Sequence, residues 1–171
     1  LWSLRPLPSA VYRQSIRPNA SNQALQAQLP PGSTMKIVTM AAGLATGKLD
    51  EHRPVHCVGG LQFRGSARLG CTGFHGWTSV YPAFAASCNA YFGQMGIWIG
   101  QKGMSQWANH FGLGVPTGID LPGEQDGNVD GPRTQEAIYR HYGKRYPGWF
   151  PGDSANMAIG QGGMLVTALQ M

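Results

Sequence analysis

The chain has 171 residues, a charged fraction of 12% and a formal net charge of +5 at pH 7. This length suffices for one domain, or part of one, over residues 1–171 and excludes two large ones. The 13 basic residues are scattered, with no run longer than Lys144-Arg145, which argues against nucleic acid as a partner. No stretch is apolar enough to span a membrane, and we expect any membrane anchor to lie outside these residues.

The N-terminal part is predicted to be irregular up to the first helix. Residues 1–21 have weak periodicity and are expected to form an irregular lead-in, and residues 22–27 a short helical turn. Pro31 and Gly32 then interrupt the chain, and an apolar run follows as far as Ala45. This pattern predicts a helix over about 33–46.

The first turn of that helix carries Ser33 and Lys36, a Ser-x-x-Lys pair. Residues three apart share one face of a helix, so the lysine amine can reach the serine hydroxyl. A neutral lysine can take the serine proton, provided that burial or a cationic neighbour lowers the lysine pKa. Such a pair arises by chance about once in a chain of this size, so its meaning depends on the rest of the sequence.

Residues 53–76 mix glycine, aromatic residues and short extended pieces, which predicts a small hairpin-like excursion. The excursion and the segment after it contain three cysteines and one histidine that form a candidate ligand set: Cys57, Cys71, His75 and Cys88. Tetrahedral zinc takes that composition of ligands. Zinc at Cys88 would tie the excursion to the segment that follows it and stiffen both.

Two other interpretations of the cysteines stay open. In the first, Cys57 and Cys71 form a disulfide, which an oxidising compartment would permit, and Cys88 is a small buried residue. In the second, His56 replaces one of the zinc ligands.

The rest of the chain is predicted to be mainly helical, with one long loop. A helix is expected to begin at Thr78 or Ser79 and to lead into Ser87, and the apolar residues 89–99 are expected to form a buried helix. Apolar side chains at helical spacing between 102 and 112 predict an amphipathic helix. Residues 117–132 are rich in turn-forming residues, and 156–171 become apolar again.

The tripeptide Ser87-Cys88-Asn89 adds a second hydroxyl and an amide. These are the groups needed to relay a proton and to hold the peptide carbonyl of a substrate. A similar Ser-x-Asn tripeptide starts at Ser154. Only Ser87 lies between two predicted helices, at a turn that could face the end of the helix carrying Ser33.

Five short motifs, in a fixed order, carry a resemblance to a known family. They are Pro31-Gly32-Ser33-Thr34-Met35-Lys36, Ser87-Cys88-Asn89-Ala90-Tyr91-Phe92, Phe111-Gly112-Leu113-Gly114, Thr117-Gly118-Ile119-Asp120-Leu121-Pro122-Gly123-Glu124 and Ile159-Gly160-Gln161-Gly162. From about Asn22 onward the chain resembles the transpeptidase domain of class B penicillin-binding proteins, most closely the elongation-type branch, penicillin-binding protein 2.

The resemblance implies an α+β fold, with helices flanking an antiparallel sheet, of which this chain would hold mainly the helical part. It also implies acyl transfer from peptidoglycan stem peptides. Ser33 would attack the penultimate D-Ala carbonyl, with Lys36 as base, and β-lactam antibiotics would acylate the same serine. Ser87 would relay a proton to the leaving D-Ala, and Asn89 would bind the donor peptide. The acyl transfer itself requires no cofactor.

Further residues are assigned by the same resemblance. The substrate-binding residues would be Gly160, Gln161 and Gly162. Some penicillin-binding proteins 2 are similar around the cysteines, with a metal held by Asp, His and Cys at about these places; here cysteine would replace the carboxylates. Gly163 departs from the family, which favours an aromatic residue there.

The third family motif, a basic residue followed by Ser or Thr and then Gly, does not occur in the chain, which ends at Met171. That motif supplies the anchor for the substrate carboxylate and one oxyanion-hole amide, so we expect the 171 residues alone to be a weak or inactive fragment. The resemblance further implies work at the outer face of the cytoplasmic membrane, in cell-wall elongation and cell-shape maintenance. A membrane glycan polymerase would be the partner.

Two alternative functions remain at this level. A D,D-carboxypeptidase or β-lactamase shares the Ser-x-x-Lys pair but passes the acyl group to water. A non-catalytic module that binds β-lactams or is stabilised by zinc would keep the fold without the chemistry.

Overall fold

The computed structural model describes residues 22–63 and 68–171, and the predicted lead-in over 1–21 lies outside these ranges. The N-terminal elements are the short helix α2 (Gln23–Gln26), the 3-10 turn η1 (Gly32–Thr34) and the helix α3 (Met35–Ala45). They confirm the predicted helical turn over 22–27 and the predicted helix over about 33–46. The other helices are α4 (Val80–Ala85), α5 (Asn89–His110), α6 (Pro132–His141) and α7 (Pro151–Ala158).

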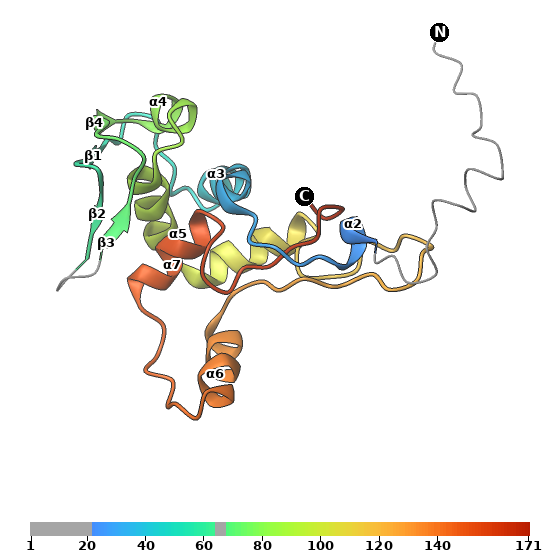
Figure 1. Cartoon of the computed structure of the whole chain (residues 1–171). Helices are drawn as coiled ribbons and strands as arrows, with labels where there is room; N and C mark the ends of the chain where they lie inside the picture. Colours follow the sequence, from blue (N-terminus) through green and yellow to red (C-terminus); the bar gives the residue numbers. More distant parts are fainter. Residues whose placement is uncertain (1–21, 64–67) are drawn as a thin grey trace, which may run out of the picture.

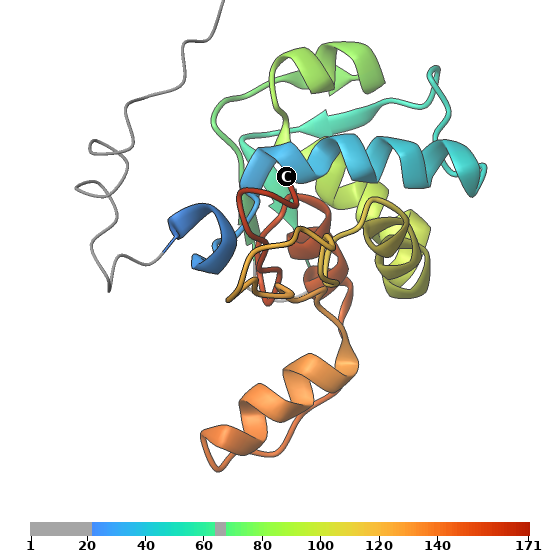
Figure 2. The same ribbon diagram turned by 90° about the vertical axis from the view of Figure 1, so that its right-hand side faces the viewer.

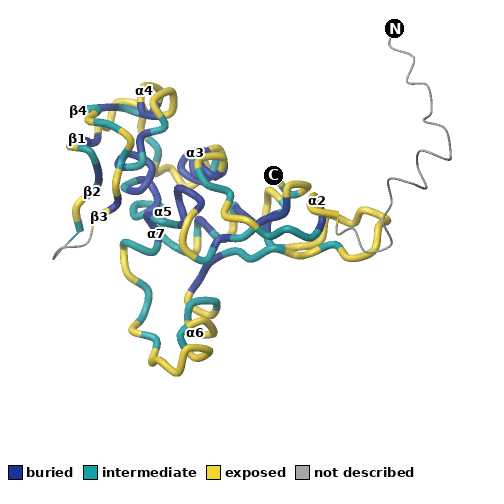
Figure 3. The backbone as a smooth tube through the Cα atoms, in the orientation of Figure 1, coloured by how far each residue is buried: buried dark blue, intermediate teal, exposed yellow. Residues whose placement is uncertain are grey.

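The helix α5 runs through the centre of the molecule, with α3 and α7 packed along it (Figures 1 and 2). Two clusters of buried apolar side chains lie along these three helices, one toward the start of α5 and one toward its end. Gly96 permits the close approach of α7, since a Cβ atom there would lie 2.4 Å from the Cβ of Ala158. Figure 3 shows the buried backbone concentrated in this part of the chain.

A break at Gly100 divides α5 into two helical segments. Its backbone is non-helical, with φ 78° and ψ 164°, a conformation that favours glycine. The two predicted helices, over 89–99 and 102–112, are therefore confirmed as one bent element. Helix α4 confirms the helix expected before Ser87, and Ser79 is its N-cap residue.

The excursion after α3 consists of two nested antiparallel strand pairs. Strand β1 (Val55–Cys57) pairs with β4 (Gly76–Thr78), and β2 (Gly60–Gln62) pairs with β3 (Arg68–Gly70). Both pairs lie beside the first half of α5 (Figure 1). The excursion predicted over residues 53–76 is thus a double hairpin, and it brings residues from both of its ends to the start of α5.

Helices α6 and α7 were not predicted from the sequence. Both begin with proline at the first helical position, where its missing N–H is not needed. The Asp153 carboxylate accepts a hydrogen bond from the Phe150 backbone N–H (2.7 Å) at the start of α7. Helix α6 has no buried residue and projects from the body (Figure 3), and its residues are polar on average, so no apolar run marks it in the sequence.

Within the described residues the only sheets are the two strand pairs, which agrees with a chain that holds mainly the helical part of an α+β fold. None of the helices in this part of the chain is both long and apolar enough to cross a membrane.

Candidate active site

Ser33 lies in the 3-10 turn η1, directly before helix α3, and its side chain is exposed. Gly32 adopts a positive φ of 60° just before it and donates its backbone N–H to the Gly160 carbonyl oxygen (3.0 Å). One turn further on, Lys36 points back toward the serine. Its side chain is 1% exposed, although lysine is rarely buried unless it is paired.

The Lys36 amine meets oxygen atoms from two parts of the chain. It lies 3.2 Å from the Ser33 Oγ and 2.8 Å from the Ser87 Oγ. It also donates to two fixed acceptors, the Ser87 carbonyl oxygen (2.7 Å) and the Asn89 Oδ1 (2.7 Å). The two hydroxyl oxygens lie 3.0 Å apart, so the three residues Ser33, Lys36 and Ser87 form a closed triangle of polar contacts.

This arrangement suits a neutral amine. A carbonyl or amide oxygen can only accept, so the two fixed acceptors engage both N–H groups of a neutral lysine. The lone pair of the nitrogen then faces the hydroxyls of Ser33 and Ser87, either of which can donate a proton to it. Lys36 is thereby oriented as a base toward the one exposed nucleophile beside it.

The electrostatic surroundings lower the pKa of Lys36 from its ordinary value of 10.5. The main cause is burial, which disfavours the charged ammonium. Negative charge on the Cys71 and Cys88 thiols acts in the opposite direction and raises the pKa. Because the net direction is downward, a larger fraction of Lys36 is neutral at a given pH than for an exposed lysine.

Ser87 is held by the way in which helix α4 ends. Its N–H bonds to the Phe84 carbonyl (3.0 Å), and the next N–H, of Cys88, bonds to the Ala83 carbonyl (2.8 Å). This pair of bonds is a Schellman motif, which places Ser87 in the left-handed conformation with φ 51°. Ser87 is the only residue other than glycine with positive φ in the described ranges, a strained conformation that these two bonds maintain. Its hydroxyl lies beside that of Ser33.

Asn89 opens helix α5, and its side chain is held at both ends. The Nδ2 group donates to the Gly70 carbonyl (3.0 Å), which orients Oδ1 toward Lys36. The Asn89 backbone N–H donates to the Cys71 Sγ (3.2 Å). The competing tripeptide at Ser154 lies elsewhere, on α7, where the Ser154 hydroxyl accepts from the Trp149 indole N–H (2.8 Å).

The predicted substrate-binding residues form a turn against the start of η1. Gly160 and Gly162 have positive φ values of 70° and 76°. A Cβ on Gly160 would lie 2.3 Å from the Gly32 carbonyl oxygen, so this approach requires glycine. The Gln161 side chain is exposed beyond this turn.

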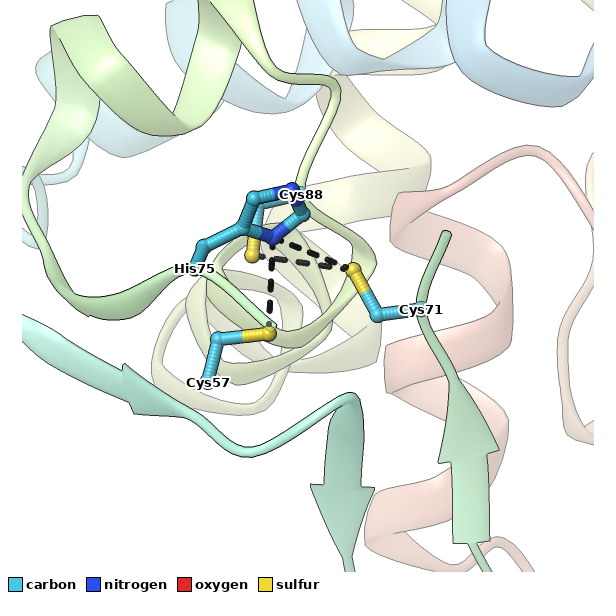
Figure 4. A group of neighbouring side chains, drawn as sticks. All are labelled: Cys57, Cys71, His75 and Cys88. Atoms are coloured by element: carbon cyan, nitrogen blue, oxygen red, sulfur yellow. Dashed lines mark hydrogen bonds between the residues drawn. The ribbon is translucent and has the colours of Figure 1, made fainter. Parts of the chain in front are cut away.

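The three cysteines and His75 meet beside this site (Figure 4). Cys57 comes from β1, Cys71 follows β3, His75 precedes β4, and Cys88 is the N-cap residue of α5. Their ligand atoms all lie within 4.8 Å of one another. All three cysteines are free thiols, so the structure does not contain the Cys57-Cys71 disulfide.

The spacing of these atoms fits a tetrahedral metal site. The His75 Nδ1 lies 3.5 Å from the Sγ atoms of both Cys57 and Cys71, and the Sγ atoms of Cys71 and Cys88 are 3.8 Å apart. Ligands at the usual zinc distances in a tetrahedron are about 3.6 Å (S to N) and about 3.8 Å (S to S) apart. His56 lies outside the cluster, stacked on Trp77, so its replacement of a ligand was a wrong alternative.

The cluster contains one thiol that ionises readily and one that does not. Burial raises the pKa of Cys71, but the hydrogen bonds that it accepts from backbone N–H groups, among them those of Ala90, Gly73 and Asn89, bring it down to about 6. The pKa of Cys88 is raised to about 12, chiefly by burial. A preformed thiolate favours binding of a cation, because metal ligands must lose their protons.

Several contacts of the site were not predicted from the sequence. Among them are the hydrogen bonds from Gly32 to Gly160, from the Asn89 N–H to Cys71 and from Lys36 to the Asn89 Oδ1. The adjacency of Cys88 to Asn89 was the one available sign that the cysteines and the catalytic candidates share a site.

Comparison with known proteins agrees with this geometry. Residues 8–171 match the family model described as "Penicillin binding protein transpeptidase domain". The chain is 31% identical over 163 residues to the peptidoglycan D,D-transpeptidase MrdA of Acinetobacter baumannii. That match covers 93% of this chain and 23% of the relative, so the chain spans about a quarter of the relative's length.

Two solved structures share the fold. The penicillin-binding protein PBP2 of Helicobacter pylori, solved in complex with MreC, superposes with a TM-score of 0.77 at 28% identity, over 88% of this chain and 27% of that one. The imipenem acyl-enzyme of penicillin-binding protein A from M. tuberculosis superposes with a TM-score of 0.70 at 27% identity, over 95% of this chain and 35% of that one.

The strain at Ser87 can be measured by comparing two substitutions that both remove its hydroxyl. We predict that the Ser87→Gly variant is more stable than Ser87→Ala by about 0.5 to 1 kcal/mol, because only alanine places a Cβ in the left-handed region. Denaturant unfolding of both variants measures the difference. A Ser87→Ala variant that is the more stable of the two would contradict the assigned backbone conformation.

Proposed function

The chain belongs to the penicillin-binding protein transpeptidase family, and we propose that it performs acyl transfer through Ser33 in a peptidoglycan D,D-transpeptidase of cell-wall elongation. The observation that carries the proposal is the placement of Lys36. Its buried amine contacts the Ser33 hydroxyl at 3.2 Å while two acceptors at 2.7 Å occupy its own N–H groups. A lysine engaged in this way is a base for the serine and not a surface cation.

The first half of the reaction follows from these contacts. The Ser33 Oγ attacks the carbonyl of the penultimate D-Ala of a stem peptide, and its proton passes to Lys36. The Ser87 Oγ lies within hydrogen-bond distance of both Lys36 and Ser33, so it can carry that proton to the departing D-Ala amine. The C–N bond breaks, and the acyl group stays on Ser33 as an ester.

The second half regenerates the enzyme. The amine of a neighbouring stem peptide attacks the ester carbonyl, and the proton of that amine passes through the Ser87 hydroxyl to Lys36. The ester C–O bond then breaks, and Lys36 gives a proton to the departing Ser33 Oγ. Asn89 donates one Nδ2 hydrogen to Gly70 and has a second for a carbonyl of the donor peptide. The exposed Gln161, with Gly160 and Gly162 beside it in the turn that follows α7, is assigned to substrate binding.

A β-lactam follows the first half only. Its strained amide acylates Ser33, and the leaving nitrogen remains attached to the inhibitor, so no amine departs to make room for an acceptor. The M. tuberculosis relative was solved as such an acyl-enzyme with imipenem, which supports the assignment of β-lactams as ligands of this chain.

The cellular setting is proposed from the relatives. The A. baumannii relative bears the name peptidoglycan D,D-transpeptidase, and the H. pylori relative assembles with MreC. We place the protein at the outer face of the cytoplasmic membrane, where peptidoglycan is cross-linked. A membrane glycan polymerase of the elongation machinery is the partner that supplies the strands.

Acylation by a fluorescent penicillin tests the proposed chemistry. The protein at its natural length is expected to form a covalent adduct, which mass spectrometry assigns to Ser33. Ser33→Ala forms none, and Lys36→Met is acylated at least about a hundredfold more slowly, because loss of a general base costs about 10² to 10⁴ in rate. Ser154→Ala, which alters the competing tripeptide, serves as the matched control and labels at the wild-type rate.

The same experiment separates the alternative functions. A folded wild-type protein without an adduct would contradict the enzymatic function and leave a non-catalytic module. Steady turnover of a chromogenic β-lactam would instead indicate a carboxypeptidase or β-lactamase, which pass the acyl group to water.

The cysteine cluster is proposed to hold a structural zinc ion, with Cys57, Cys71, His75 and Cys88 as its ligands. Zinc fits the distances between the ligand atoms, the set of three cysteines and one histidine, and the ready ionisation of Cys71. Zinc takes no part in acyl transfer in this proposal. It would tie the double hairpin to the start of α5, next to Asn89 and Ser87.

Metal analysis with thiol counting tests the zinc site. The purified protein is expected to contain about one equivalent of zinc, since a structural site is near full occupancy. Cys57→Ser should lose most of the zinc and lower the melting temperature. His56→Ala, which alters the neighbouring histidine on the same strand, should keep it. Zinc below about a tenth of an equivalent, together with a single free thiol, would indicate the disulfide instead.

A further inference from the structure

Asp130 is a buried carboxylate that the chemistry described above does not use. It is 1% exposed and lies at the end of the turn-rich segment, just before helix α6. Within residues 22–63 and 68–171 the ion pairs are His52–Glu51 and Arg140–Glu136, so Asp130 has no cationic partner in these ranges. A buried carboxylate without a cation is stable only when its oxygens accept hydrogen bonds.

Both oxygens of this carboxylate accept backbone N–H groups from different segments. Oδ1 accepts from Gly131 (2.9 Å), and Oδ2 accepts from Gly163 (2.8 Å). The Gln135 side-chain amide donates to both oxygens at 3.0 Å. The carboxylate also lies at the N-terminus of α6, where the helix dipole favours negative charge.

Hydrogen bonds consequently hold Gly163 at both its backbone N–H and its carbonyl oxygen. Its N–H bonds to Asp130, and its carbonyl accepts from the Asn128 side-chain amide. A Cβ on Gly163 would lie 2.5 Å from the Asp130 Oδ1. The carboxylate therefore occupies the space that a side chain at 163 would need, which explains why glycine stands there.

The segment that begins with the 160–163 turn holds the chain that leads to Ser33. The Gly160 carbonyl accepts the Gly32 N–H (3.0 Å), and the Val166 and Leu29 backbones exchange two hydrogen bonds of 2.9 Å. Gly32 immediately precedes Ser33. A continuous set of backbone contacts thus connects the Asp130 carboxylate to the residue that sets the position of the nucleophile.

We propose that Asp130 is a positioning residue for acylation: it fixes the 160–163 turn, and the turn fixes Gly32 and with it the Ser33 hydroxyl. This inference rests on the proposed function for its catalytic consequence. The coupling from Asp130 to Gly32 stands on the backbone contacts alone.

The substitution Asp130→Asn tests the inference with almost no change of shape. The side-chain amide of asparagine has only one oxygen, but the backbone N–H groups of both Gly131 and Gly163 need an acceptor. In the variant, one of these two N–H groups therefore faces the NH2 group of the asparagine. In the protein at its natural length we expect the Gly32 amide to exchange its hydrogen about tenfold faster or more. Residues 30 and 31 are prolines and have no backbone N–H. In a proteolytic peptide that begins at residue 30, Gly32 is therefore the first residue whose amide hydrogen exchanges.

Acylation by the fluorescent penicillin provides the second measurement. We expect the limiting acylation rate of Asp130→Asn to fall about tenfold while the dissociation constant before acylation changes little, because the nucleophile is misplaced and the binding groups are kept. Gln135→Ala is the matched control, since it keeps both backbone bonds, and should behave like wild type in both measurements. Gly163→Ala pushes the carboxylate away from the other side and should reproduce the Asp130→Asn result.

The inference is overturned if the Gly32 amide exchanges its hydrogen as slowly in the folded Asp130→Asn and Gly163→Ala variants as in the wild type. If the exchange at Gly32 is faster but the acylation rate is unchanged, the role of Asp130 in positioning Ser33 is also overturned. A wild-type protein that forms no adduct contradicts the proposed function, and in that case the exchange at Gly32 still decides whether Asp130 holds the turn.

Discussion

The candidate site depends on one amine that is almost completely removed from water. Lys36 is 1% exposed, and its contacts join η1, the turn at Ser87 and the start of α5. Burial makes the charged form costly, and the two fixed acceptors of Ser87 and Asn89 are as well suited to a neutral amine as to an ammonium. The same burial that orients the side chain therefore also prepares it to accept a proton from Ser33.

The surrounding structure serves to keep those acceptors in place. The end of α4 forces Ser87 into a left-handed conformation, and Gly70 anchors the amide of Asn89. Two neighbours of this site, Cys88 and Cys71, belong to the cysteine cluster, and Cys71 also accepts a hydrogen bond from the Asn89 N–H. A metal bound there would hold the start of α5, so the contacts of Lys36 with Asn89 and the fold of the double hairpin would share one support.

The sequence was sufficient for the local parts of this arrangement and insufficient for the distant ones. The spacing of Ser33 and Lys36 predicts their contact, because helix geometry alone brings them together. The placement of Ser87 beside them was expected from its position in a turn between two predicted helices and from the ordered motifs, since no local rule connects residues 54 positions apart. The break at Gly100 was anticipated as a boundary between two helices. Helix α6 was missed because it buries no residue and is polar on average, so it contains no apolar run.

The contacts of the Gly160 turn with Gly32 and with Asp130 could not be predicted from local sequence rules either. The Gly160 turn contains the two glycines that a left-handed backbone needs, which the motif could indicate. Its partner at Gly32 could not be inferred, because backbone hydrogen bonds between distant segments leave no pattern in side-chain chemistry. Asp130 was likewise unremarked as one acid among the eight acidic residues of the chain.

The pH dependence of Ser33 acylation tests most directly whether Lys36 acts as a neutral, buried base. The acylation rate constant of the protein at its natural length would be measured with a fluorescent penicillin from about pH 6 to about pH 11. The rate should rise with pH as the ammonium loses its proton, with an apparent pKa below the ordinary lysine value of 10.5. A rate that is independent of pH, or that rises only at or above that value, would contradict the account.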